Sequence, residues 1–315
     1  MNKFIVCTTI NPPTEALIKF AEMEDWQLII VMDKKTPIEG YMEDVFSNTI
    51  LFTCEGQEEQ YSELSLMLGW NTVDRRNLGY LLAYDQGADV VAMIDDDNIP
   101  NDDWGVCVVG KPITARVFEQ KKSFVFDPLS VFRKEDGIPW HRGFPIHSVS
   151  ERYNHQMQLS LSKIRFDVQA NLWNGDPDVD AICRMQLTKP INFPICPYYS
   201  SDKISPFNMQ NTMISRRALK YCPSIPFTGR MCDIWGAYYL QAKTGYRVVY
   251  GPATVTHKQH RSWESIVNDM YEEMPGYQNN EIVDLMLENH SDVVLREIAG
   301  NQAADFVQAY QESFK

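Results

Sequence analysis

One stretch of the chain, residues 71–100, constrains the fold more than any other. Leucines at helical spacing follow Arg75-Arg76-Asn77 and predict a helix that ends at Gly87: Leu78, Leu81 and Leu82. The continuous apolar run Val90–Ile94 then predicts a short strand covered on both faces. A helix that feeds such a buried strand is typical of an α/β sheet, so we expect an α/β fold.

The predicted strand runs directly into Asp95-Asp96-Asp97. In an open α/β sheet, ligands bind beyond the carboxyl ends of the strands. Adjacent carboxylates repel one another unless a cation is present, and alternation along an extended chain puts Asp95 and Asp97 on one side. We therefore predict a divalent metal held by Asp95, Asp97 and phosphate oxygens. A solvated acidic turn or a calcium-stabilised loop is the alternative.

The four residues Arg76-Asn77-Leu78-Gly79, at this distance before the acids, resemble a motif of the nucleotide-diphospho-sugar transferases of the GT-A fold. In that family a helix with an Arg-Asn-x-Gly-like start precedes a strand ending in Asp-x-Asp, which binds Mn²⁺ or Mg²⁺ on the donor diphosphate. The resemblance implies a GT-A-like Rossmann-type, mixed but mainly parallel sheet flanked by helices. It also implies a UDP- or GDP-sugar donor, contacted by these residues: Arg76, Asn77, Asp95 and Asp96.

Composition limits the partners of the chain. Its 315 residues carry a net charge of −13, which argues against a general grip on nucleic acid or on an anionic membrane. The seven cysteines are scattered without a Cys-x-x-Cys pair, which fits reduced thiols rather than a disulfide framework or a zinc site. No apolar window approaches the length of a membrane span, and Asn11-Pro12-Pro13 ends the first apolar run too early for a signal peptide. We expect a soluble, cytoplasmic protein.

The first part of the chain has the order of a nucleotide-binding sheet. Alternating strand and helix patterns cover Lys3–Thr9, residues 14–24, Gln27–Met32 and residues 48–53. An acidic loop is expected from there to Glu63. The GT-A resemblance implies that Thr8, Thr9 and Asp33 surround the nucleoside of the donor, and ordinary strand-end and turn positions are the alternative.

Residues 101–150 give weaker patterns. Short strands are predicted at residues 106–109 and 123–126, among loops. The segment Trp140-His141-Arg142-Gly143-Phe144-Pro145 either borders the sugar or acceptor or forms a bend packed on the core, and none of its residues is assigned a role.

The next informative stretch is residues 172–180, Leu-Trp-Asn-Gly-Asp-Pro-Asp-Val-Asp. It resembles a phrase of the plant reversibly glycosylated polypeptides (UDP-arabinopyranose mutases) and of the STELLO-type glycosyltransferase-like proteins. The resemblance implies that Trp173, Asp176 and Asp178 lie near the sugar. The alternative is that Asp176 caps the following helix, whose first turn would suit Pro177.

Residues 206–219 resemble the GT-A segment where a short strand leads into a helix that lines the sugar pocket. Asn208 and Asn211 are the hydrogen-bonding candidates there.

A helix is predicted to begin near Cys232-Asp233. In inverting GT-A enzymes a carboxylate at this point removes the proton from the acceptor hydroxyl, so the resemblance implies Asp233 as general base. An N-cap aspartate favoured by the helix dipole is the alternative. Arg230 either neutralises the leaving diphosphate or pairs with Asp233.

Residues 246–256 predict a late pair of strands that leads into His257-Lys258. The GT-A resemblance implies that a histidine here is the third protein ligand of the metal, with His257 preferred and His260 as the second choice. Imidazole together with carboxylates suits Mn²⁺. Lys258 is the candidate that holds the diphosphate.

Residues 262–315 predict amphipathic helices that cover the sheet or form a subunit contact. We therefore divide the chain into a GT-A-like nucleotide-sugar-binding domain, residues 1–261, and a helical extension, residues 262–315. The predicted activity is metal-dependent transfer of a hexosyl or pentosyl group from a nucleotide-diphosphate sugar to an acceptor hydroxyl, with the acceptor unidentified. A mutase of the reversibly glycosylated polypeptide type and a non-catalytic nucleotide-sugar-binding scaffold are the alternatives.

Overall fold

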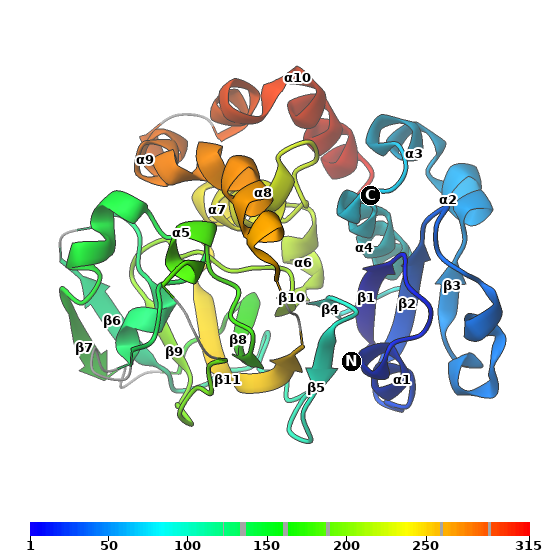
Figure 1. The fold of residues 1–315 in the computed structure, drawn as a ribbon, viewed down its shortest axis with the longest axis horizontal. Helices are drawn as coiled ribbons and strands as arrows, with labels where there is room; N and C mark the ends of the chain where they lie inside the picture. The colour runs from blue at the N-terminus through cyan, green and yellow to red at the C-terminus, as the bar shows by residue number, and fades with distance from the viewer. Residues whose placement is uncertain (122, 133–136, 160–162, 187–189, 259–260, 289–290) are drawn as a thin grey trace.

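The computed structural model describes residues 1–121, 123–132, 137–159, 163–186, 190–258, 261–288 and 291–315. In these residues a single mixed sheet of eleven strands runs through the molecule and is flanked by helices, as expected for an α/β fold (Figure 1). The strands are β1 (Lys3–Thr9), β2 (Gln27–Met32), β3 (Ile50–Phe52), β4 (Val90–Ile94), β5 (Asn98–Pro100), β6 (Arg116–Gln120), β7 (His155–Leu159), β8 (Val168–Gly175), β9 (Tyr199–Ser201), β10 (Asn211–Ser215) and β11 (Val248–His257). The longer helices are α1 (Glu15–Ala21), α2 (Cys54–Gln60), α3 (Ser62–Leu68), α4 (Arg76–Asp85), α7 (Cys232–Thr244), α8 (Trp263–Glu273), α9 (Asn279–Glu288) and α10 (Ser291–Glu312).

The sheet order is β3-β2-β1-β4-β10-β8-β11-β9-β6-β7, with β5 paired to β11. The N-terminal strands β1 to β4 are parallel, so their carboxyl ends meet at one edge of the sheet. From β10 onward antiparallel pairs alternate with parallel ones. The mainly parallel character that we expected is therefore a property of the N-terminal half alone.

Both faces of the N-terminal strands are buried, each by a different hydrophobic cluster. Val6 and Val31 face the cluster that includes helices α4 and α7, whereas Ile5 and Ile30 face the cluster that includes α1. Successive side chains of a strand point to opposite faces, which explains why these strands are continuously apolar. The predicted strands at Lys3–Thr9, Gln27–Met32 and Val90–Ile94 are confirmed.

Gly79 explains how α4 reaches the sheet. A Cβ atom at this position would lie 2.5 Å from Cγ2 of Val31 and 2.6 Å from Cγ1 of Val6, closer than side-chain atoms tolerate. The glycine of the Arg-Asn-x-Gly sequence therefore lets the helix backbone pack directly on β1 and β2.

The expected acidic loop before Glu63 is wrong, because the chain forms α2 and α3 there. Thr53 caps α2 by accepting a hydrogen bond from the backbone N–H of Gly56 at 3.2 Å. The buried Gln57 side chain donates to the carbonyl oxygens of Met32 and Phe52, each at 2.7 Å. A polar side chain thus attaches a largely polar helix to the sheet, which an apolar periodicity cannot reveal.

The central part of the chain also differs from expectation. The short strands lie at β6 and β7 instead of residues 106–109 and 123–126, and the second of these segments makes only one isolated bridge in the described chain. The backbone N–H of Val108 donates to Oε1 of Gln169 at 2.7 Å, so a side chain takes the place of a strand partner. The expected strand pair at residues 246–256 is a single strand, β11, whose register shifts between Gly251 and Val255.

The predicted helix start at Cys232 is confirmed, and residues 263–312 are helical wherever they are described. In Figure 1 helices α8, α9 and α10 lie together along one side of the molecule, where α9 contacts α7 and α10 contacts α3. None of the helices in the described ranges is both long enough and apolar enough to cross a membrane.

Candidate functional site

A cavity of about 290 Å³ lies at the carboxyl ends of β1, β2 and β4. This is the edge of the sheet where the parallel strands of an α/β fold present their ligand site. The residues predicted to bind the donor or the metal that line this cavity are Thr8, Thr9, Asp33, Arg76, Asp95, Asp96 and Asp97. Four stretches that are separate in the sequence therefore supply one cavity.

The three aspartates after β4 point to three different partners. Asp95 accepts from Arg76 Nη2 at 2.7 Å, and Asp96 accepts from the Thr9 hydroxyl at 2.5 Å. The carboxylate of Asp97 lies 3.1 Å from Nε2 of His257. The three aspartates do not lie on an extended chain, because Asp95–Asn98 forms a turn in which the N–H of Asn98 donates to the carbonyl oxygen of Asp95 at 3.3 Å. The expected alternation, with Asp95 and Asp97 on one side, therefore lacks the extended backbone on which it rested.

Asp95 is close both to the positive charge of Arg76 and to the negative charge of Asp97. Its pKa is raised to about 6, because burial and the neighbouring Asp97 carboxylate outweigh the stabilising charge of Arg76. The side chain nevertheless remains 36% exposed to the cavity. A cation that enters the cavity would relieve this repulsion between carboxylates.

His257 is oriented so that its Nε2 atom faces Asp97. Its Nδ1 atom lies 2.8 Å from the carbonyl oxygen of Asp176, an acceptor that requires the ring N–H on Nδ1. Burial lowers the pKa of His257, but the hydrogen bond and charge of Asp97 outweigh burial and raise the pKa above its ordinary value. In metal-binding histidines the nitrogen that does not hold the metal commonly donates to a carbonyl or carboxylate oxygen, as Nδ1 of His257 does here.

Asp97 and His257 offer a carboxylate oxygen and an imidazole nitrogen, which are donors of the kinds that a divalent cation takes. Oδ2 of Asp176, whose carbonyl oxygen lies beside the His257 ring, is buried without a hydrogen bond among the described residues. In the part of the chain that the structure describes, no group of three His, Cys, Asp or Glu side chains is arranged to hold a metal ion. Asp95 pairs with Arg76 instead of joining the other two, and His260 lies outside the described residues.

A second cluster of charges surrounds Arg142. The guanidinium donates to both carboxylate oxygens of Asp178, at 2.8 and 2.9 Å, and to both of Asp233, at 2.9 and 2.7 Å. All three side chains are buried. One arginine thus holds two carboxylates that the sequence had singled out, and sequence reasoning assigned no role to Arg142.

Asp178 is stabilised as an anion. Burial alone would raise its pKa, but the charge and hydrogen bonds of Arg142, with the charge of Arg230, hold the pKa well below its usual range. Asn208 also donates to Asp178 Oδ2 at 2.7 Å. Arg230 lies 3.5 Å from Asp178 but pairs more closely with Glu273, at 2.6 Å, and not with Asp233.

The aspartate at the start of α7 does not cap the helix. Met231 occupies the N-cap position, and Asp233 accepts from the backbone N–H of Ile234 through Oδ1 at 2.8 Å. Its Oδ2 atom accepts from Arg142 and, at 3.4 Å, from the N–H of Met209. Because the Met209 carbonyl in turn accepts from Arg76 at 3.1 Å, the Arg142 cluster and the cavity are adjacent.

Several predicted site residues lie outside the cavity and hold the fold together. The Asn77 amide bonds the backbone of Asp74 and Ser224, and the Asn211 amide bonds Leu172, Thr254 and the indole of Trp104. Trp173 is buried in the core against His141 and Phe193.

Two further predicted residues are engaged in ion pairs. Asp176 pairs with Arg184 at 2.6 Å and caps no helix, because Asp180 caps the short helix α5 (Ala181–Arg184) through the N–H of Cys183. Lys258 is exposed and pairs with Glu15 at 3.1 Å.

Comparisons with known proteins agree with the resemblance found in the sequence. No protein-family model matches the chain. Two proteins of Arabidopsis thaliana, "Probable glycosyltransferase STELLO2" and "Probable glycosyltransferase STELLO1", are each 25% identical to it over 190 residues, which is 57% of this chain and 24% of theirs. The chain thus spans about a quarter of the length of these relatives.

Among solved structures, the crystal structure of A197 from STIV covers 81% of this chain and 83% of its own, at 10% identity. Its TM-score of 0.37 is too low to support an argument. The similarity to known proteins therefore rests on the sequence match to the two Arabidopsis proteins. By sequence, the chain is similar to part of these two proteins, each named as a probable STELLO glycosyltransferase.

Proposed function

We propose that the chain is a glycosyltransferase that moves a sugar from a nucleotide-diphosphate sugar to an acceptor hydroxyl. The observation that carries this proposal is the cavity in which Thr8, Thr9, Asp33, Arg76 and Asp95–Asp97 meet, beside the carboxylates that Arg142 holds. The names of the two Arabidopsis relatives support the same reaction class.

The donor nucleotide occupies the cavity in this proposal. Asp33 is held at the cavity wall by the backbone N–H groups of Lys34 and Asn71, at 2.6 and 2.8 Å, and is placed to accept from a ribose or base. Arg76 lies beside Asp95 and supplies positive charge next to the acids. Asp97 and His257 would hold a Mn²⁺ or Mg²⁺ ion, which would neutralise negative charge on the leaving diphosphate.

The acceptor hydroxyl approaches Asp233. Its oxygen forms a bond to the anomeric carbon of the sugar while the bond from that carbon to the diphosphate oxygen breaks. The proton of the hydroxyl passes to Oδ2 of Asp233. This oxygen accepts one short hydrogen bond, from Arg142, and one long one, from the N–H of Met209. Oδ1 accepts two short hydrogen bonds and so has less room for a proton. Arg142 fixes the direction of this carboxylate, as a general base requires.

The first experiment is a thermal-shift panel of UDP-, GDP-, CMP- and dTDP-sugars, each with and without Mn²⁺. A ligand present at a hundredfold its dissociation constant stabilises the folded state by about 2.7 kcal/mol. We expect one nucleotide class to raise the melting temperature, and to do so more strongly with Mn²⁺.

The matched variants are Asp97→Ala and Asp102→Ala. Asp102→Ala changes the net charge by the same amount as Asp97→Ala. Because Asp102 is exposed and lies outside the cavity, this change leaves the cavity intact. The metal-dependent shift should disappear in the first variant and persist in the second. A folded wild-type protein that responds to no donor would refute the proposal. If a donor stabilises the protein but no nucleotide diphosphate is released with any acceptor, the scaffold alternative is favoured instead.

A further inference from the structure

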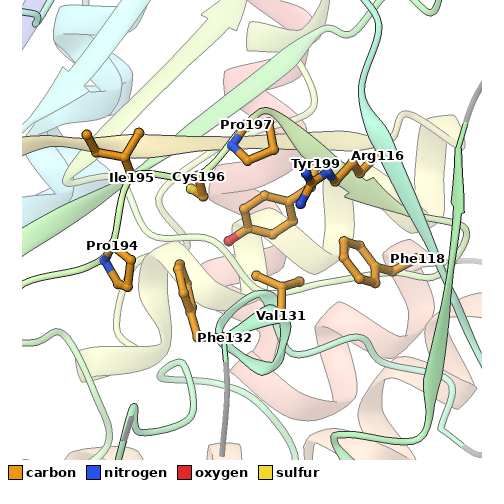
Figure 2. Close-up of a pocket in the computed structure, with 9 residues that line it drawn as sticks. All are labelled: Arg116, Phe118, Val131, Phe132, Pro194, Ile195, Cys196, Pro197 and Tyr199. Carbon is orange, nitrogen blue, oxygen red and sulfur yellow. The ribbon is translucent and has the colours of Figure 1, made fainter.

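A second cavity, of about 500 Å³, lies far from the nucleotide cavity along the sheet, at β6 and β9 (Figure 2). It shares no lining residue with the nucleotide cavity. Figure 2 shows the 194–197 segment on one side, Arg116 and Phe118 on the other, and the ring of Tyr199 between them. Polar and apolar atoms share the wall surface about equally, and the apolar part comes from Phe118, Val131, Phe132, Pro194, Ile195 and Pro197.

Ile195 opens this cavity to solvent, whereas Phe118, Phe132 and Tyr199 are buried. Ile195 is 98% exposed, although isoleucine is among the residues most often buried. Cavities of a few hundred Å³ lined by apolar side chains and a few polar groups are typical of sites for small molecules. The size and lining therefore suit a ligand with an apolar body.

Three of the residues that line this cavity carry a polar group: Tyr199, Cys196 and Arg116. The Tyr199 hydroxyl already donates to the carbonyl oxygen of Pro128 at 2.9 Å, so its proton is not available to a ligand. Burial raises the pKa of the Cys196 thiol to about 11, against the opposing charge of Arg116, which leaves this thiol neutral at pH 7. The Arg116 guanidinium has no carboxylate within ion-pair distance among the described residues.

An unpaired arginine is notable here because the chain carries a net charge of −13. Among the described residues four of the five buried arginines have a carboxylate partner, Arg76, Arg142, Arg152 and Arg184, whereas Arg75 bonds Gln57, Ser65 and Gly69 instead. Arg116 itself is exposed. Arginine binds anions through a planar fork of N–H donors, and such charge-assisted hydrogen bonds are stronger than neutral ones.

We propose that this cavity binds a small amphipathic anion, whose apolar body lies against Phe118, Phe132 and Tyr199 and whose single negative group pairs with Arg116. The proposal does not depend on the glycosyltransferase function, because the two cavities are separate.

The probes that test it share one apolar body and differ in charge: 4-phenylbutyrate, 4-phenylbutanol and 4-phenylbutylamine. The readout is the rate at which N-ethylmaleimide alkylates Cys196, measured by peptide mass spectrometry. Cys54 is the other half-buried cysteine and lies outside this cavity, so it is an internal reference for the fold. We expect the carboxylate to protect Cys196 at roughly tenfold lower concentration than the alcohol or the amine, and to leave Cys54 unaffected.

Two variants separate the charge from the shape of the cavity. Arg116→Gln should abolish the advantage of the carboxylate probe. Arg247→Gln is the control and should preserve that advantage, because Arg247 is exposed and lies outside the cavity. Ile195→Asp changes a side chain that is almost fully exposed, so folding should be unaffected, and its negative charge should offset that of Arg116 and remove the advantage of the carboxylate over the amine. Equal protection by all three probes, no protection of Cys196 at millimolar concentrations, or an unchanged preference in Arg116→Gln would each overturn the proposal.

Discussion

Nε2 of His257 lies 3.1 Å from Oδ2 of Asp97, a residue 160 positions earlier in the chain. The strand pairing explains this contact, because β5 runs antiparallel to β11 and places Asn98 opposite His257. On its other side β11 is parallel to β8, which places Gly175 opposite the same histidine. The position of the imidazole therefore depends on backbone contacts from two strands.

Gly175→Ala should disturb His257 directly. Gly175 has φ +92°, and a Cβ atom there would lie 2.4 Å from the carbonyl oxygen of His257. We expect a loss of unfolding free energy of at least about 2 kcal/mol, from backbone strain and overpacking together, and loss of the Mn²⁺-dependent thermal shift. Urea denaturation and the thermal-shift panel measure the two effects.

Gly110→Ala is the matched control for this variant. Gly110 also has a positive φ, +71°, but a Cβ atom there would have no neighbour within 4 Å. It should lose only about 1 kcal/mol, the cost of the left-handed conformation, and keep the metal response. Equal losses in the two variants would show that the contact with His257 does not matter.

Gly79→Ala should destabilise the fold although alanine is the better helix former. The added methyl group would overlap Val31 and Val6, and overpacking of this kind costs about 1–3 kcal/mol. Gly56 is also helical, but there a Cβ atom would make an ordinary contact of 3.5 Å with Phe52. Gly56→Ala should therefore stabilise the protein by about 0.5–1 kcal/mol, and urea denaturation should give opposite signs for the two substitutions.

The parallel strands β1, β2 and β4 were predictable because each carries its own signal, whereas helices α2 and α3 between them were not. Val90–Ile94 is buried on both faces, so its apolar run is continuous, and Asp95 follows where the strand ends. The GT-A resemblance implied that Thr9 and Asp33 surround the donor, and they line one cavity with Asp95 because parallel strands end at the same edge.

The Arg142 cluster could not be predicted in the same way. Arg142 lies in an irregular segment, and its two partners are 36 and 91 residues away, so no spacing in the sequence relates them. Asn77 and Asn211 were predicted to contact the donor, but both amides bond backbone groups in the core. In the sequence, an asparagine of this kind looks the same as one that binds a ligand. Only the three-dimensional contacts separate these two roles.

Removal of Arg142 should be costly, because it leaves Asp178 and Asp233 buried without their cation. Loss of one partner from a buried ion pair typically costs about 3–5 kcal/mol. Arg142→Lys keeps the charge but cannot form paired hydrogen bonds with both carboxylates, so we expect a smaller loss of stability together with loss of sugar transfer. Urea denaturation and nucleotide-diphosphate release measure the two effects.

Arg152→Lys supplies the comparison for this prediction. Arg152 pairs with the buried Asp127 at 2.7 Å and does not contact the Arg142 cluster or line the nucleotide cavity. It should lose similar stability and keep its activity below the melting temperature. If the two lysine variants transfer sugar equally well, Arg142 does not position the catalytic carboxylate.

Asp180 should make stability depend on pH in a direction opposite to that of most carboxylates. Burial, opposed by its hydrogen bond from Cys183, raises its pKa to about 6, so between its unfolded pKa of about 4 and pH 6 the folded state binds more protons than the unfolded state. This group therefore lowers stability as pH rises from 4 to 6, by about 2 kcal/mol in total. Asp180→Asn removes the effect, and the difference between wild type and variant in urea-measured stability should change over this pH range. A constant difference from pH 4 to pH 7 would contradict the raised pKa, whatever the variant's absolute stability.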